Sequence, residues 1–295
     1  MSRPVLRFAP SPNGRLHLGH AFSALTNARI AARLDGRLLL RIEDIDLGRS
    51  RPEFVQGILD DLAWLGLRFE TPVRRQSEHF ADYVAARARL SARGLIYPCF
   101  CSRGRIAAEV AERRARGEGG RCDPDGAPLY PGTCRALPRG ATEARIEAGE
   151  PHTWRLDMAA ACRDIPGTLV IRRFAPDGSE ERVWADPARW GDAVIARRDV
   201  PTSYHLAVVC DDALQGITHV VRGQDLEAAT DLHVLLQHLL GLPSPAYHHH
   251  PLIRDEGGEK LAKSKGSQSL ADLRGQGIST NTVLETLGFK IHHFA

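Results

Sequence analysis

The first 65 residues alternate between short apolar segments and helix-forming segments, and this alternation restricts the fold more than any other feature. Residues 5–9 (VLRFA) predict a buried strand, and residues 38–42 predict a second one. Apolar residues at helical spacing follow each strand, over 18–28 and over 54–65, and residues 50–53 (SRPE) predict a capping box with proline inside the first turn. Strand–helix–strand–helix alternation predicts an α/β domain with a parallel sheet.

The same alternation returns after a long interruption. Residues 204–210 and 218–222 resume the α/β pattern, and a helix is predicted over about 226–240, ending near Gly241. We therefore expect one nucleotide-binding domain that an insertion divides. Its halves are residues 1–97 and 196–270, the insertion is residues 98–195, and a short helical remnant follows at residues 271–295.

The motif His17 to His20 (HLGH) lies where the first predicted strand turns into the first helix. A helix N-terminus offers unpaired backbone N–H groups and a positive dipole end, which suit phosphate. The imidazoles of His17 and His20 could donate to phosphate oxygens, and Gly19 would let an adenine ring approach the backbone. The alternative is that both histidines are incidental residues of a helix start.

A second motif, KLAKS, occupies residues 260–264 and is flanked by glycines. Lys260 and Lys263 could close over a triphosphate and neutralise the charge that develops on it. A solvated surface loop is the alternative, but the presence of HLGH in the same chain favours a catalytic role.

Four of the six cysteines lie within the 36 positions from Cys99 to Cys134. In a chain without secretory features this crowding favours a metal site over disulfides. Cys99, Cys101 and Cys134 could hold zinc as thiolates, and composition nominates Cys122 as the fourth ligand. Three buried thiols without a metal are the alternative.

The consecutive histidines 248–250 also resemble a metal tract. Consecutive residues of an extended chain point to alternate sides, so they cannot all face one ion. We expect one of them near the nucleotide and the others in solvent. The arginine-rich residues 103–121 are expected to form a helix that frays into a loop, either against RNA phosphate or as a solvated face.

Several segments together resemble the glutamyl-tRNA synthetase family of class I aminoacyl-tRNA synthetases, in order and in spacing. They span about residues 5 to 265 and are RFAPSPNGRLHLGH, RIEDID, YHLAVVCDD, THVVRGQDL and KLAKS. The resemblance implies a Rossmann-like domain, an ATP-dependent ligase activity with Mg²⁺, and catalytic roles for the HLGH histidines and for Lys260 and Lys263. It also implies that His17, Gly19, His20 and Lys263 bind ATP.

The family match also implies a pocket for L-glutamate. A dicarboxylate amino acid needs two cationic contacts and an anionic one for its ammonium group. Arg7 and Arg222 would supply the cations, in an order that the sequence leaves open, and Glu43 would take the ammonium. Further hydrogen bonds would come from Ser11, the Ala9 backbone and the Tyr204 hydroxyl. All of these are expected at strand ends or adjoining turns; singly, each charge could equally form a surface salt bridge.

The resemblance changes the expected zinc ligands. The family places a tyrosine four residues before the last cysteine, and Tyr130 has that offset from Cys134. We therefore expect Cys99, Cys101, Tyr130 and Cys134 to hold one structural Zn²⁺, with Cys122 as the main alternative to Tyr130. The chain departs from the family at Ala262, where serine is common, and at His205, where relatives often carry asparagine.

Only 31 residues follow KLAKS, so no anticodon-binding domain is expected. In this the chain resembles shortened members of the family that activate glutamate and attach it to queuosine in the anticodon of tRNA(Asp). Two alternatives stay open: a shortened enzyme that charges a tRNA 3′ end, and a non-catalytic RNA-binding relative.

Composition leaves these readings open and excludes others. Charged residues make up 25% of the chain and the net charge is only +3, which permits RNA binding without requiring it. There is no signal-peptide pattern and no apolar run long enough to cross a bilayer. We expect a cytoplasmic monomer that does not bind membranes. Its expected partners are ATP, L-glutamate and the queuosine-containing tRNA(Asp).

Overall fold

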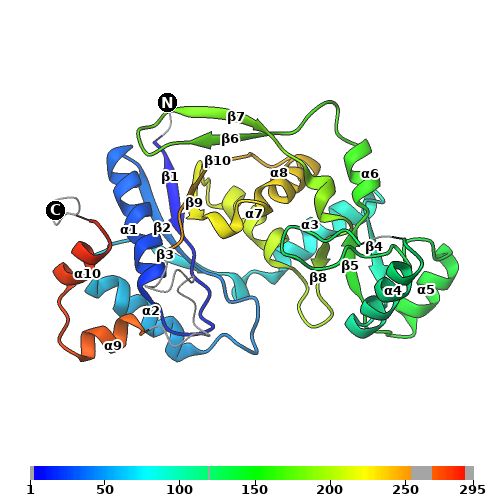
Figure 1. Ribbon diagram of the computed structural model, residues 1–295, viewed down its shortest axis with the longest axis horizontal. Coiled ribbons are helices and arrows are strands. Elements are labelled where there is room, and N and C mark those ends of the chain that lie inside the picture. Colours follow the sequence, from blue (N-terminus) through cyan, green and yellow to red (C-terminus); the bar gives the residue numbers. More distant parts are fainter. Residues whose placement is uncertain (1–2, 119, 254–267, 290–295) are drawn as a thin grey trace.

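The structure is a computed structural model that describes residues 3–118, 120–253 and 268–289 (Figure 1). Its centre is a set of parallel strands in two sheets that meet edge to edge. The first sheet has the order β1-β2-β3 and the second β7-β6-β10-β9. Their bounds are β1 Val5–Phe8, β2 Arg37–Ile42, β3 Glu70–Arg75, β6 Val170–Phe174, β7 Glu180–Trp184, β9 His219–Gly223 and β10 Ala246–His250.

Strands β1 and β9 lie side by side where the two sheets meet. The backbone N–H of Thr218 donates to the Val5 carbonyl oxygen over 3.0 Å, which aligns the starts of the two strands. Strand β6 also runs parallel to β10, on the side away from β9. The other parallel strands run in the order β3-β2-β1-β9-β10. This is the 3-2-1-4-5 order of nucleotide-binding α/β sheets, whose ligands bind at the carboxyl ends of the strands.

Helices cover both faces of these strands because successive strand residues point to opposite sides. Leu6 and Val221 pack on one face with Ile30 of α1 (Leu18–Arg33). Val5 and Val220 pack on the other face, against α8 (Ala229–Leu240). Helix α2 (Pro52–Trp64) shares a further core with α1 and with the C-terminal helices α9 (Leu270–Gly275) and α10 (Thr280–Thr286).

A third layer lies beyond α8 and carries the cysteine segment. Helices α3 (Phe80–Ala92), α7 (Tyr204–Leu214) and α8 enclose one core with a small antiparallel sheet of order β4-β5-β8. Figure 1 places α4 and α5 beyond this sheet, at the opposite end of the molecule from α9 and α10. The remaining bounds are β4 Ile96–Cys99, β5 Thr153–Leu156, β8 Val194–Ala196, α4 Arg103–Ala115, α5 Arg139–Glu147, α6 Met158–Arg163, and 3₁₀ turns at Gln76–Glu78, Pro187–Trp190 and Gln224–Leu226.

The predicted α/β fold with a parallel sheet is confirmed, and two local predictions are wrong. Arg51, not Ser50, is the N-cap of α2, and no side chain caps it, although Pro52 does open the helix. Tyr204 is not at a strand end: it is the first residue of α7, behind the capping hydroxyl of Ser203. The predicted division of the nucleotide-binding domain by an insertion over residues 98–195 stays a prediction. The KLAKS residues lie outside the described ranges.

Across the described ranges, no helix combines the length and apolar character needed to span a membrane.

Candidate functional site

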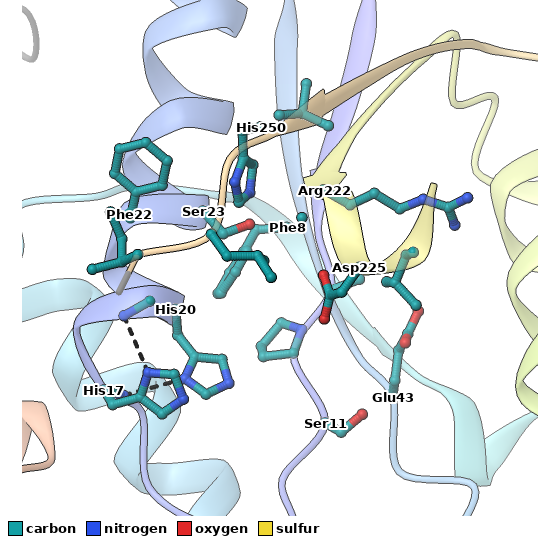
Figure 2. Close-up of a pocket in the computed structure, with 18 of the residues that line it drawn as sticks. Phe8, Ser11, His17, His20, Phe22, Ser23, Glu43, Arg222, Asp225 and His250 are labelled. Carbon is teal, nitrogen blue, oxygen red and sulfur yellow. Dashed lines mark hydrogen bonds between the residues drawn. The ribbon is translucent and has the colours of Figure 1, made fainter. Parts of the chain in front are cut away.

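A pocket of about 650 Å³ opens at the carboxyl ends of β1, β2 and β9, in front of the N-terminus of α1. Figure 2 shows His17 and His20 on one side of this pocket and Arg222 and Glu43 on the other. The pocket thus brings together every predicted ATP and glutamate residue that the structure describes. These are Arg7, Ala9, Ser11, His17, Gly19, His20, Glu43, Tyr204 and Arg222.

The HLGH motif forms the cap of helix α1. Nδ1 of His17 accepts the backbone N–H of Gly19 over 3.1 Å, and Nδ1 of His20 accepts the backbone N–H of His17 over 3.2 Å. A neutral imidazole whose Nδ1 accepts carries its proton on Nε2. The cap therefore sets both rings as Nε2–H donors at a helix N-terminus, the arrangement that suits phosphate oxygens.

Gly19 has a steric role in this cap. A β-carbon at Gly19 would lie 3.0 Å from the His17 ring, closer than side chains normally approach. The two imidazole centroids are only 3.9 Å apart. The glycine therefore permits the tight packing of the histidine pair, in addition to the predicted approach of an adenine ring.

On the glutamate side, Arg7 belongs to a buried network of alternating charges. Its Nε donates to Asp212 over 3.0 Å, and Arg41 donates to Asp212 over 2.7 Å and to Glu43 over 3.1 Å. The Arg41 side chain is 0% exposed and those of Asp212 and Arg7 are 5% and 4% exposed. Each cation here already faces a carboxylate of the protein.

This network shifts the pKa of its carboxyl groups in opposite directions. Burial acts to raise the pKa of Asp212, but Arg7 and Arg41 outweigh it, and the pKa is lowered. Burial dominates at Glu43 and raises the pKa of that carboxyl, while Arg41 and Arg7 oppose the rise. A bound ammonium group beside Glu43 would favour its ionised form.

Arg222 lies at the end of β9 in a different environment. Its guanidinium donates to Tyr204 Oη over 3.4 Å, to His233 Nδ1 over 3.1 Å and to Thr230 Oγ1 over 2.8 Å. It also reaches His249 Nε2 over 3.3 Å. Within the described part of the chain no carboxylate forms an ion pair with Arg222, although this residue is only 5% exposed.

The partners of Arg222 are held neutral. Burial first, and then the charge of Arg222, lower the pKa of His249 to about 3 and that of His233 well below its usual value. A buried guanidinium surrounded by neutral groups keeps its positive charge uncompensated, which favours an anionic ligand. One of the three consecutive histidines, His250, lines the pocket as expected, but His249 is not in solvent, since it contacts Arg222.

Sequence reasoning missed several residues of the site. Arg41 and Asp212 lie inside segments that were matched to the family, yet only their neighbours were assigned roles. Asp225 also lines the pocket, three residues after Arg222. A β-carbon at Gly223 would lie 2.4 Å from the Asp225 carboxylate oxygen, so this glycine signals the close approach.

A second chemical centre lies at the start of the cysteine segment. The Sγ atoms of Cys99, Cys101 and Cys134 all lie within 4.8 Å of one another, and all three residues are buried. Zn–S distances of about 2.3 Å in a tetrahedron separate the sulfurs by roughly 3.8 Å, so three thiolates at these positions fit zinc. Burial raises the pKa of Cys101 to about 11, so a thiolate there needs a nearby cation.

The structure brings Tyr130, and not Cys122, to these thiols. The Tyr130 hydroxyl lies 3.6 Å from Cys101 Sγ and accepts the backbone N–H of Cys134 over 2.9 Å. Cys122 is exposed, and its Sγ accepts from Arg114 over 3.8 Å. The phenol oxygen is therefore the side-chain donor placed to complete a tetrahedral set, and Cys122 is not.

Comparison with known proteins agrees with this geometry. Residues 5–290 match the family described as class I tRNA synthetases (E and Q), catalytic domain. The chain is 45% identical to a glutamyl-Q tRNA(Asp) synthetase of Rhodobacter capsulatus, over 96% of this chain and 99% of that one. It is 40% identical to a protein of the same name from Symbiobacterium thermophilum, over 96% and 85% of the two chains.

Among solved structures, a glutamate tRNA ligase from Elizabethkingia meningosepticum in complex with its amino acid is similar, with a TM-score of 0.72 and 28% identity. The match covers 90% of this chain, which spans about half (53%) of that longer one.

Proposed function

The chain belongs to the class I tRNA synthetase family for glutamate and glutamine, and we propose that it activates L-glutamate with ATP and attaches it to the queuosine base of tRNA(Asp). The observation that carries the proposal is that one pocket has the HLGH imidazoles on one side and, on the other, Arg222, which no carboxylate of the described residues neutralises. The names of its full-length relatives support the acceptor.

In the first step the α-carboxylate of glutamate attacks the α-phosphorus of ATP, and pyrophosphate leaves. Arg222 and Arg7 would hold the two carboxylates of glutamate and Glu43 its ammonium, with hydrogen bonds from Ser11, Tyr204 and the Ala9 backbone. Because no carboxylate of the described residues pairs with Arg222, we assign it the stronger carboxylate contact. His17 and His20 would donate to the phosphates as negative charge builds on them, assisted by Lys260 and Lys263.

In the second step a hydroxyl of the modified base attacks the carbonyl carbon of glutamyl-adenylate. A new ester bond forms, the acyl–phosphate bond breaks, and AMP leaves with the bonding electrons. The hydroxyl proton passes to a phosphate oxygen of the departing AMP as the ester forms. No side chain of the protein has to accept the acyl group.

Two metals belong to the proposal in different roles. ATP enters as its Mg²⁺ complex, in which the ion neutralises phosphate charge. Zn²⁺ would be structural, held by Cys99, Cys101, Cys134 and Tyr130 with no open position for substrate. Cytoplasmic location and a monomeric state also remain parts of the proposal.

The decisive test is the acceptor. Purified protein is incubated with ATP, labelled glutamate and tRNA(Asp) that either carries queuosine or lacks it. Label is expected only on the modified tRNA. Charging of tRNA(Glu) without dependence on queuosine would instead establish a shortened enzyme that acts on a 3′ end. Absence of glutamate-dependent ATP–pyrophosphate exchange, with and without tRNA, would favour a non-catalytic relative.

The zinc centre has its own matched pair of variants. We expect Cys134→Ser to lose most of the bound zinc and Cys122→Ser to retain it, as measured by metal analysis of the purified proteins. Zinc retained at the wild-type level in Cys134→Ser would contradict the proposed ligands. Tyr130→Phe measures the phenol contribution, and unchanged zinc affinity in that variant would remove Tyr130 from the set.

A further inference from the structure

A second cavity of about 1170 Å³ lies next to the glutamate pocket, and the side chain of Tyr204 belongs to the wall of both. It extends from the cysteine segment to the start of α7. Charged side chains of both signs line it: five arginines and four aspartates, namely Arg49, Arg103, Arg155, Arg197, Arg198, Asp123, Asp125, Asp192 and Asp199. His205, the next residue after Tyr204 and a point of departure from the family, also lines this cavity.

The ring of His205 is held from several sides. Its centroid lies 5.4 Å from that of Trp190 and 5.3 Å from that of His233, both at steep interplanar angles. Trp190 is itself fixed, because its indole N–H donates to the carbonyl oxygen of Ala228 over 3.1 Å. The orientation of the His205 ring is therefore set by packing before any ligand enters.

The tautomer of His205 follows from its link to Arg222. A guanidinium can only donate, so His233 Nδ1, which lies 3.1 Å from Arg222, must accept and the proton of His233 must be on Nε2. That Nε2–H faces His205 Nδ1 over 3.1 Å, so His205 Nδ1 must accept in turn. The proton of His205 is consequently on Nε2.

The protonation state agrees with this chain of donors. Burial, and then the charge of Arg222, lower the pKa of His205 to about 4, so the ring is neutral near pH 7. Within the described ranges Nε2 of His205 has no hydrogen-bond partner, and the residue is only half-buried in a cavity wall. The chain Arg222–His233–His205 thus ends in a directed N–H donor at the second cavity.

We propose that the second cavity receives the acceptor nucleoside, and that His205 is a positioning residue that donates its Nε2–H to an oxygen or an unprotonated nitrogen of that nucleoside. This rests on the proposed function. An acceptor hydroxyl must reach the activated carbonyl from a side that ATP does not fill, and the shared wall at Tyr204 offers that side. Arg49 and Arg197 are paired with carboxylates. Arg103 and Arg198 form no ion pair within the described ranges, and these two arginines suit the phosphates that flank a nucleoside in RNA.

The test compares two substitutions of His205 in the full chain. In His205→Gln the amide oxygen can accept from His233 and the amide N–H₂ can donate to the cavity, whereas His205→Phe keeps the ring volume and does neither. For each protein, ATP–pyrophosphate exchange measures the first step and glutamate transfer to queuosine-containing tRNA measures the second. His238→Gln is the matched control, since His238 is an exposed residue of the helix that carries His233.

We expect His205→Phe to lower the ratio of transfer to exchange about tenfold, mainly through a raised KM for the tRNA, and His205→Gln to restore most of it. An unchanged ratio in His205→Phe, or an equal loss in His205→Gln, would overturn the proposal. Absence of exchange in the wild-type protein is a different result, because it would overturn the proposed function and this proposal with it.

A second measurement does not depend on the folding of a variant. In wild-type protein labelled with ¹⁵N-histidine, near pH 7.5, His205 and His233 should both show a protonated Nε2 and an unprotonated Nδ1. Addition of the queuosine nucleoside should shift the Nε2–H resonance of His205 and leave that of His238 unchanged. A proton on Nδ1 of His205 would overturn the donor assignment.

Discussion

Arg7 and Arg222 lie at the ends of adjacent parallel strands and line the same pocket, yet the protein surrounds them differently. Arg7 faces Asp212, which Arg41 also contacts. Arg222 faces a tyrosine, a threonine and two histidines. The two arginines hold similar positions in the sheet, but a carboxylate neutralises Arg7, whereas the groups that contact Arg222 are neutral.

This difference separates two requirements of the site. The carboxylates around Arg7 and Arg41 stabilise the folded strand ends, because a buried cation is tolerated when it is paired. The neutral groups around Arg222 hold its guanidinium in place without cancelling its charge. We conclude that the Arg7 network fixes the pocket and that Arg222 is the residue most available to an anionic substrate.

The largest expected effect is the loss of Asp212. Asp212→Asn removes the shared carboxylate of two buried guanidinium groups and should lower the free energy of unfolding by about 3–5 kcal/mol. Urea denaturation followed by circular dichroism measures this. The matched control is Glu70→Gln, which breaks an ion pair of half-exposed side chains and should cost less than about 1 kcal/mol. Equal losses in the two variants would remove the special role of the Arg7 network.

Arg222→Gln should separate binding from stability. The variant would lose the proposed charged contact to glutamate, and its KM for glutamate should rise about a hundredfold. Because no carboxylate is left unpaired, the free energy of unfolding should fall far less than in Asp212→Asn. Glutamate-dependent ATP–pyrophosphate exchange and urea denaturation give the two values, with Arg172→Gln as an exposed arginine control. A KM within a few fold of wild type would refute the comparison.

The two clusters should also lose stability in different pH windows. His205 and His249 have folded pKa values of about 4 and about 3, below the usual 6.5, so the neutral rings favour folding above pH 6.5. As pH falls below 6.5 the unfolded chain binds more protons, and each histidine then removes at most about 1.4 kcal/mol per pH unit.

The pKa of Asp212 is lowered, so its contribution is present above about pH 4 and is lost only as pH falls further. Urea denaturation at intervals from pH 7.5 to pH 3.5 should therefore show a first decline that is reduced in His249→Gln and preserved in Asp212→Asn. A decline that begins only below pH 4 would contradict the assignment of neutral, buried histidines around Arg222.

The smallest effect is expected for Arg7→Lys. A lysine ammonium can keep one contact to Asp212 but cannot reproduce the fork of the guanidinium. Since much of the Arg7 charge is already neutralised, the KM for glutamate should rise only about fivefold. The same exchange assay measures it. A rise larger than that of Arg222→Gln would reverse our assignment of the stronger carboxylate contact.

The sequence predicted much of this pocket because periodicity fixes which strands are buried, and polar residues directly after buried strands meet at one sheet edge. Arg222 and Glu43 were assigned to the pocket through the family resemblance, and their positions at the ends of β9 and β2 agree with that rule. The capping box at Ser50 was wrong because its four-residue pattern also fits a helix that begins one residue later at Pro52. Tyr204 was misplaced because the short apolar run that follows it, residues 206–210, suits a buried helix as well as a strand.

Charge balance could not be predicted in the same way. Asp212 contacts Arg7 across 205 positions of sequence, and His233 contacts Arg222 from helix α8. Such pairings depend on side-chain directions in three dimensions, which no spacing rule contains. For the same reason Tyr130 and Cys122 could not be separated until the fold placed one beside the thiols and the other on the surface.

A short backbone pairing holds the chain that follows the lysine motif against the start of helix α1. His17 and Ser269 form an isolated antiparallel bridge, and the backbone N–H of Leu270 donates to the Leu16 carbonyl oxygen over 2.8 Å. On the other side of the lysine motif, Ile253 lines the pocket. The described residues on either side of 254–267 therefore contact the pocket or the start of α1.

In the proposed reaction Lys260 and Lys263 belong to the covalent segment between these two anchors, so their encounter with a bound triphosphate would be intramolecular. Its frequency is set by an effective concentration rather than by diffusion through the solution. A cut in the chain between the anchors would remove that advantage while leaving every side chain of the described pocket in place.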